Sequence, residues 1–179
     1  MDLDRVKKIA VTSLAGSHDF SHIERVLRYA KKIHDVHNGN WKIIEAALAI
    51  HELTKENLET VRNYLDGFSE DEIKQVVYCI EHHHDFVNKP ETIEGKILQD
   101  ADIIDMLGAI GIARGFMSSG ERKLSLVDGK NEYKKKRLAL MDCLNLEESR
   151  RIATERYEFT KLFFETIDKE LEPQKLLGL

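Results

Sequence analysis

Cysteine and proline are both scarce in this chain, with two residues of each kind among 179. Cys79 and Cys143 stand far apart among apolar neighbours, so we expect two core thiols in a reducing, cytoplasmic setting rather than a disulfide framework. No apolar run reaches the roughly 18–20 residues that cross a bilayer. The opening stretch, MDLDRVKKIAVTSLAG, also lacks the basic-then-apolar order of a signal peptide.

A strong excess of one charge is missing as well. The formal net charge is −5, which disfavours broad binding to nucleic acid or to an anionic membrane but leaves room for a local basic patch. Apolar residues make up 42% of the sequence, enough for a real hydrophobic core at this length. We therefore expect one domain over residues 1–179 and leave its oligomeric state open, a homodimer included.

The sequence also lacks the alternation of apolar and polar residues that is typical of strands. Helical periodicity dominates instead. Ser or Asn followed three residues later by Glu predicts helix starts near Ser21, Ser69 and Asn145. The predicted helices cover residues 6–14, 21–37, 40–51, 58–65, 69–82 and 146–171, with an apolar segment interrupted by glycines over 93–117. We expect an all-α helical bundle in which 118–133 is a loop, long enough to form a lid or a mobile connection.

The stretch LAIHELTKEN, residues 48–57, raises the first question about function. An apolar run over 46–50 stops at His51 and Glu52, an imidazole beside a carboxylate. Such a pair is usually a surface feature, because acids and histidines are mostly exposed. An apolar helix leading straight into the pair argues for the other interpretation, a site for a divalent metal ion.

Three further clusters offer metal ligands next to apolar runs. His18 and His22 have i, i+4 spacing, three histidines stand together at 82–84, and QDADIID contains Asp100, Asp102 and Asp105. Unpaired carboxylates inside an apolar segment are costly to bury. Each cluster alone also fits a helix cap, a solvated turn or an exposed helix face, so spacing by itself leaves a metal site and ordinary surface residues both open.

The order of these motifs resembles the HD superfamily of metal-dependent phosphohydrolases. Its H…HD…D signature is matched by His22-x-x-Arg25-Val26, then His51-Glu52, then QDAD at 99–102. The flanking PETIEGKILQDAD, GAIGIARGF and EESRRIATERYEFTKLFFE make the chain similar to a bacterial subfamily that includes a nucleoside triphosphate pyrophosphohydrolase. The resemblance spans about residues 2–172 and implies a helical HD-type domain.

The resemblance also implies roles for individual residues. Four residues are the implied ligands of a divalent ion, manganese ahead of magnesium, cobalt, nickel, iron or zinc: His22, His51, Glu52 and Asp102. Residues expected to contact the substrate are His18, Arg25, Arg114 and Arg137. The catalytic candidates are Lys55 and His83, which match the family, and Glu56 and Asp105, two nearby acids that could transfer protons. Arg25 has an alternative role in orienting a carboxylate, and the basic run 134–136 also fits an ordinary helix surface.

Two positions depart from the family pattern. Glu52 replaces the aspartate of HD, which keeps the charge but adds a methylene, and Ile103 stands where the subfamily has an arginine. As a whole, the resemblance implies hydrolysis of a (deoxy)nucleoside triphosphate to monophosphate and pyrophosphate. A monophosphate phosphatase and a cyclic-nucleotide phosphodiesterase are related alternatives. From a different class, a degenerate HD protein would bind a nucleotide or a partner protein without catalysis. A purely structural zinc site is disfavoured, because neither cysteine lies near the histidines.

Overall fold

The computed structural model describes residues 20–53 and 58–171, and within these ranges every regular element is a helix. The predicted all-α class is confirmed there, while the helix predicted over 6–14 lies outside the described residues. The elements are α2 (Phe20–His37), α3 (Trp41–Ile50), the 3-10 helix η2 (Leu58–Tyr64), α4 (Glu70–His82), α5 (Ile93–Asp105), α6 (Gly108–Glu121), α7 (Leu126–Cys143) and α8 (Glu147–Leu171). None of the described helices is long and apolar enough to span a bilayer.

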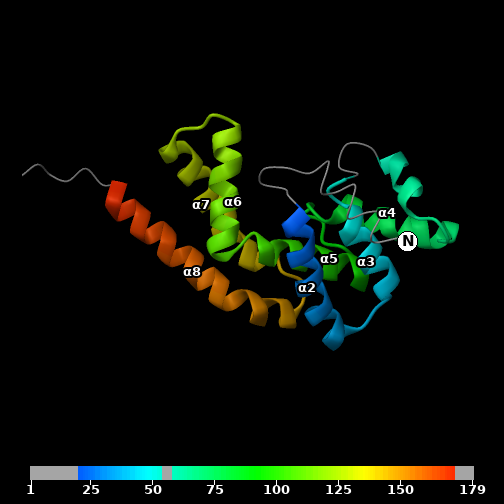
Figure 1. Cartoon of the computed structure of the whole chain (residues 1–179). Helices are drawn as coiled ribbons and strands as arrows, with labels where there is room; N and C mark the ends of the chain where they lie inside the picture. Colours follow the sequence, from blue (N-terminus) through cyan, green and yellow to red (C-terminus); the bar gives the residue numbers. More distant parts are fainter. Residues whose placement is uncertain (1–19, 54–57, 172–179) are drawn as a thin grey trace, which may run out of the picture.

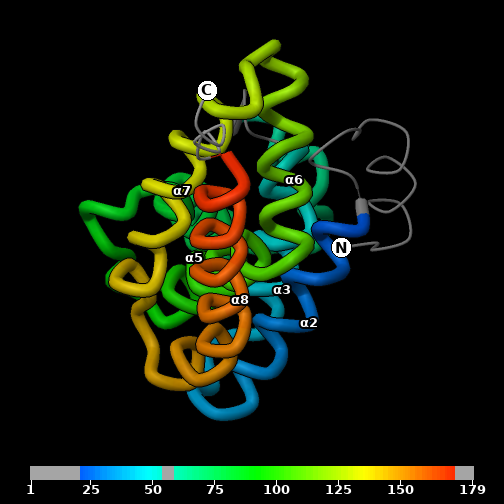
Figure 2. Tube along the Cα trace, turned by 90° about the vertical axis from the view of Figure 1, so that its left-hand side faces the viewer, coloured from blue at the N-terminus to red at the C-terminus, as the bar shows by residue number. Residues whose placement is uncertain are grey.

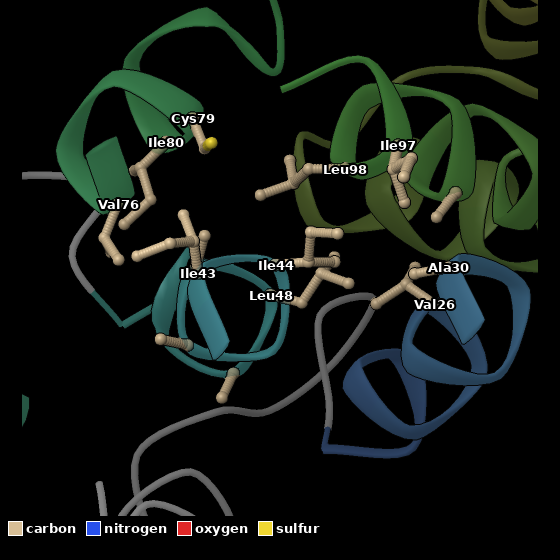
Figure 3. Close-up of a cluster of buried hydrophobic side chains, with 14 of the residues drawn as sticks. Val26, Ala30, Ile43, Ile44, Leu48, Val76, Cys79, Ile80, Ile97 and Leu98 are labelled. Carbon is tan, nitrogen blue, oxygen red and sulfur yellow. The ribbon is translucent and has the colours of Figure 1, made fainter. Parts of the chain in front are cut away.

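The centre of the fold is α3, which packs against α2, α4 and α5. Figure 3 shows Ile43, Ile44 and Leu48 of α3 pointing toward the apolar side chains of its three neighbours. Seven of its ten residues are buried: Ile43, Ile44, Ala46, Ala47, Leu48, Ala49 and Ile50. Burying each large aliphatic side chain contributes about 1.5–3 kcal/mol, so this helix is firmly held and delivers the residues that follow it to a fixed place.

A second group of helices, α6, α7 and α8, packs mutually and is joined to the first through α5. In Figure 1, α6 and α7 stand beside the α2–α5 group, and the long α8 runs below α6 and α7 and reaches the α2–α5 group at one end. Figure 2 shows α8 crossing α5, the contact that ties the two groups together. A pocket described below opens between these groups.

The apolar segment over 93–117 is divided into two helices rather than forming one. Gly108 takes a φ of +76°, a left-handed conformation that favours glycine, and it begins α6. Two side chains of α8 satisfy the backbone of this break. The guanidinium of Arg156 donates to the carbonyls of Ile104 and Leu107, and the Gly108 N–H donates to Thr160 Oγ1 at 2.8 Å.

The prediction of a loop over 118–133 is wrong. Helix α6 continues to Glu121 and α7 starts at Leu126, so only 122–125 connects them. The Ser125 hydroxyl accepts a hydrogen bond from the Asp128 backbone N–H at 3.1 Å and caps α7. A polar, glycine-containing stretch therefore becomes helical through this cap and through contacts with α6 and α8.

Of the two predicted caps at the starts of α4 and α8, one forms and the other does not. Ser69 and Glu72 form the predicted capping box at the start of α4. The Asn145 side chain does not cap α8 but donates to Gln99 and Asp100 instead. The buried Asp100 carboxylate accepts from the two backbone N–H groups ahead of α8, at 2.8 and 2.9 Å. A residue distant in sequence thus replaces the local cap.

Candidate metal centre

Three helices bring the predicted metal ligands together. His22 lies on α2, Asp102 on α5, and His51 and Glu52 directly follow α3. All four residues are buried, with exposed fractions of 8% or less. The apolar run before His51 is thus explained, because α3 carries its polar end into the space between α2 and α5.

The donor atoms of these residues converge. His22 Nε2 lies 3.4 Å from Asp102 Oδ1 and 3.5 Å from Glu52 Oε1, and His51 Nε2 lies 3.6 Å from the same glutamate oxygen. His22, His51 and Asp102 each offer a donor atom, and the three atoms lie within 4.8 Å of one another. Imidazole nitrogens and carboxylate oxygens in this arrangement suit a divalent transition-metal ion.

Each histidine ring is oriented by a bond at its other nitrogen. His22 Nδ1 lies 2.8 Å from Asp105 Oδ2, and His51 Nδ1 lies 2.7 Å from the Leu48 carbonyl oxygen. Metal-binding histidines characteristically use one nitrogen in this way, which directs the other toward the ion. His51 Nε2 is buried and has no hydrogen-bond partner among the described residues, so the residues present fit a metal ion.

Asp105 is itself held by two arginines. Arg25 contacts both of its oxygens, at 2.7 and 3.1 Å, and Arg114 Nη1 lies 2.6 Å from Oδ2. The carboxylate is fully buried. This geometry favours a positioning role for Asp105 and for Arg25, because Arg25 is engaged with the carboxylate that orients His22.

Electrostatics separate the two ligand histidines. Burial acts to lower the pKa of His22, but hydrogen bonding to Asp105 and Glu52 outweighs it and raises the pKa to about 9. Burial lowers the pKa of His51 to about 3, so this imidazole is neutral at pH 7. Burial also works against the Asp102 carboxylate, yet His84 and His22 hold its pKa well below the usual range. A neutral imidazole and an ionised carboxylate are the forms that bind metal, so His51 and Asp102 are already in these forms, whereas His22 would give up its proton when a metal binds.

A pocket of about 230 Å³ opens beside these ligands. Its polar lining includes Glu52, Asp102, His84, Arg114 and Arg137. The remaining lining residues are Phe86, Met106, Gly111, Ser118 and Tyr133. The pocket therefore combines carboxylates and imidazole with two guanidinium groups.

The other predicted site residues are distributed as follows. His18, Lys55 and Glu56 lie outside the described residues. His83 is buried in the turn after α4, with its ring 5.3 Å from that of His51. Arg137 of α7 stacks at 4.8 Å over the Tyr133 ring and has no carboxylate partner among the described residues. The basic run is partly engaged, since Lys134 pairs with Asp168.

His84 was missed as an individual site residue. Its Nε2 lies 3.3 Å from Asp102 Oδ2, and its half-exposed side chain lines the pocket. The sequence signal was the run of three histidines at 82–84, whose members periodicity cannot rank. At the departing position, Ile103 is fully buried in the hydrophobic core and not part of the pocket lining.

Comparison with known proteins identifies relatives in sequence and in fold. No family model matches the chain. It is 30% identical to the uncharacterized protein YpgQ of Bacillus subtilis (strain 168), over 90% of this chain and 88% of that one. The crystal structure of Bacillus subtilis YpgQ in complex with ADP superposes with a TM-score of 0.78 at 28% identity, covering 96% and 95% of the two chains. An HD-superfamily hydrolase from Bacillus thuringiensis gives a TM-score of 0.74 at 29% identity, covering 96% and 97%.

Proposed function

Since the chain belongs to the HD superfamily of hydrolases, we propose that it is a metal-dependent phosphohydrolase that cleaves a (deoxy)nucleoside triphosphate into monophosphate and pyrophosphate. The observation that carries the proposal is the convergence of His22, His51, Glu52 and Asp102 at one edge of a pocket that also contains arginines. The ADP complex of YpgQ supports a nucleotide as the ligand.

The metal would be held by two imidazoles and two carboxylates. Manganese is our first choice, and magnesium, cobalt, nickel, iron and zinc suit the same donors. When bound, such an ion lowers the pKa of a water molecule and polarises a phosphoryl oxygen. Glu52 is included as a ligand because its Oε1 lies near both His22 Nε2 and His51 Nε2, so its longer side chain still reaches the site.

The chain's own cations would bind the phosphates. Phosphoryl transfer depends on positive charge beside the non-bridging oxygens. Arg137 suits this role because its guanidinium lines the pocket without a carboxylate partner among the described residues. Arg114 also lines the pocket while it contacts Asp105, so it would bind substrate from a fixed position.

In the reaction, a water oxygen would bond to the α-phosphorus while the bond from that phosphorus to the bridging oxygen breaks. Pyrophosphate leaves with the bridging oxygen, and the proton of the attacking water passes to a base. His83 and Asp105 are the described candidates from the sequence. The engagement of Asp105 with Arg25, Arg114 and His22 favours His83 of the two.

The second candidate function is a degenerate HD protein that binds a nucleotide without hydrolysing it. Glu52 in place of aspartate is the observation that favours it. Phosphate and pyrophosphate release from a panel of nucleoside mono- and triphosphates separates the two functions. Metal-stripped protein would be compared with protein reloaded with each divalent ion, using His51→Ala as the inactive variant and His82→Ala as the matched control.

We expect metal-dependent pyrophosphate release by the wild type and by His82→Ala, and none by His51→Ala. Phosphate release from a nucleoside monophosphate would instead redirect the assignment to the related phosphatase activity, and opening of a cyclic nucleotide to a nucleoside monophosphate would redirect it to the phosphodiesterase activity. Nucleotide binding without turnover at any ion would favour the degenerate protein, and Glu52→Asp would then be tested for restored hydrolysis.

A further inference from the structure

The turn after α4 carries His83 and His84, and the side chain of Gln99 holds the backbone of this turn. Gln99 lies on α5 and is fully buried. Its Nε2 donates hydrogen bonds to the carbonyl oxygens of His82 and Asp85, both at 3.1 Å. These two acceptors flank His83 and His84 in the sequence, so a single amide group fastens both ends of the segment that contains the two histidines.

The orientation of the Gln99 amide is determined by its partners. Its Oε1 accepts a hydrogen bond from Asn145 Nδ2 at 2.9 Å, just ahead of α8. Asn145 is itself fixed, because Nδ2 also donates to Asp100 Oδ1 at 2.7 Å. In the opposite orientation, the Gln99 oxygen would face two carbonyl oxygens and its amide nitrogen would face that of Asn145. The hydrogen bonds therefore permit one orientation, and Gln99 ties the turn to the start of α8.

The same face of α5 also contacts the turn through Asp102. Residues three apart on a helix are neighbours, and Asp102 Oδ2 lies 3.3 Å from His84 Nε2. His83 is buried, with its Nδ1 2.5 Å from the Ile80 carbonyl oxygen and its Nε2 without a hydrogen-bond partner among the described residues. The direction of this Nε2 atom therefore depends on the backbone of the turn, which Gln99 holds.

We propose that Gln99 is a positioning residue for the reaction, one that fixes the turn so that His83 and His84 face the metal ligands and the pocket. Gln99 is not among the residues that line the pocket, so it would act through the turn and not on the substrate. The inference rests on the proposed function, in which His83 accepts the proton of the attacking water. A misplacement of about 1 Å can lower a rate by about 100-fold.

Gln99→Met tests this role, because methionine has a similar length but no N–H group to donate. We expect kcat for pyrophosphate release to fall by about 10–100-fold. KM should change less, because the arginines proposed to bind the phosphates lie on α6 and α7. Leu65→Ala is the control for lost stability, since it removes a buried side chain ahead of the start of α4, at the other end of that helix. Its kcat should remain that of the wild type.

A second readout does not depend on turnover. Long-range ¹H–¹⁵N NMR spectra of the full chain with Mg²⁺, which is diamagnetic, report on the imidazole nitrogens. The signals of His83 and His84 should shift in Gln99→Met, whereas those of His34 on α2 should not. Asn145→Ala removes the donor to Gln99 Oε1 and should shift the same signals by less, so it provides the test if Gln99→Met does not fold.

The positioning role and the proposed function fail differently. An unchanged kcat in Gln99→Met, a loss no larger than in Leu65→Ala, or unshifted His83 and His84 signals would overturn the positioning role and leave the hydrolase assignment standing. If Gln99→Met does not fold, unshifted signals in Asn145→Ala would overturn it. A wild type without turnover would overturn the proposed function, and the imidazole signals would still decide whether Gln99 orients the turn.

Discussion

Gly115 of α6 allows the Tyr133 ring to pack directly against the helix backbone. A Cβ at this position would lie 2.6 Å from Tyr133 Cδ1 and Cε1, whereas ordinary van der Waals contacts begin at 3.4 Å. The ring would have to move by nearly 1 Å, and overpacking of this kind costs about 1–3 kcal/mol. Alanine in a helix interior offsets about 1 kcal/mol of that cost. Gly115→Ala should therefore lower the free energy of unfolding by about 0–2 kcal/mol.

Gly120 on the same helix supplies the control, because a Cβ there would meet nothing within 4 Å. Gly120→Ala should gain up to about 1 kcal/mol from helix propensity. Urea unfolding measures both variants, which should differ by about 1–3 kcal/mol, the overpacking cost itself. In a Tyr133→Ala background the clash disappears, so Gly115→Ala should become stabilising. Equal stability of the two glycine variants, or no change of sign in the Tyr133→Ala background, would refute the packing argument.

Three further predictions follow from other contacts. Asp100→Asn should cost about 2–3 kcal/mol in urea unfolding, because both carboxylate oxygens accept hydrogen bonds from the N–H groups ahead of α8 and an amide nitrogen cannot accept one of them. The exposed Asp71→Asn should leave stability nearly unchanged. Burial raises the pKa of Cys79 to about 12, so at pH 7–9 its thiol stays protonated and a thiol reagent should modify Cys143 alone until the protein is unfolded. Equal labelling of both cysteines in the native state would contradict this. Arg137→Gln should raise the KM for a triphosphate by about 10–100-fold while metal binding is unchanged, and an unchanged KM would remove Arg137 from the substrate site.

The parts of the fold that the sequence predicts are those governed by local chemistry. The apolar run of α3 and the capping box at Ser69 need only neighbouring residues, and both appear in the structure. The polar composition of 118–133 predicts a loop, but the Ser125 cap and the packing of α6, α7 and α8 make most of this stretch helical. The start of α8 depends on Asp100, far away in the sequence, and no local rule identifies that partner.

The candidate site also contains residues that the sequence predicts and residues that only the packing of the helices reveals. The order of the family's motifs predicts His22, His51, Glu52 and Asp102 as ligands, and the structure places all four side by side. The engagement of Asp105 with residues of α2 and α6 depends on how those helices pack. His84 emerges only from the geometry, because the run of three adjacent histidines does not tell which of them contacts Asp102.

The most direct test of the central claim is pyrophosphate release from a nucleoside triphosphate by metal-stripped protein, followed by phosphorus NMR before and after Mn²⁺ is added. We expect no hydrolysis before addition, cleavage to monophosphate and pyrophosphate after it, and no cleavage by His51→Ala under either condition. Hydrolysis that proceeds without metal, or at the same rate in His51→Ala, would contradict the assignment of this site.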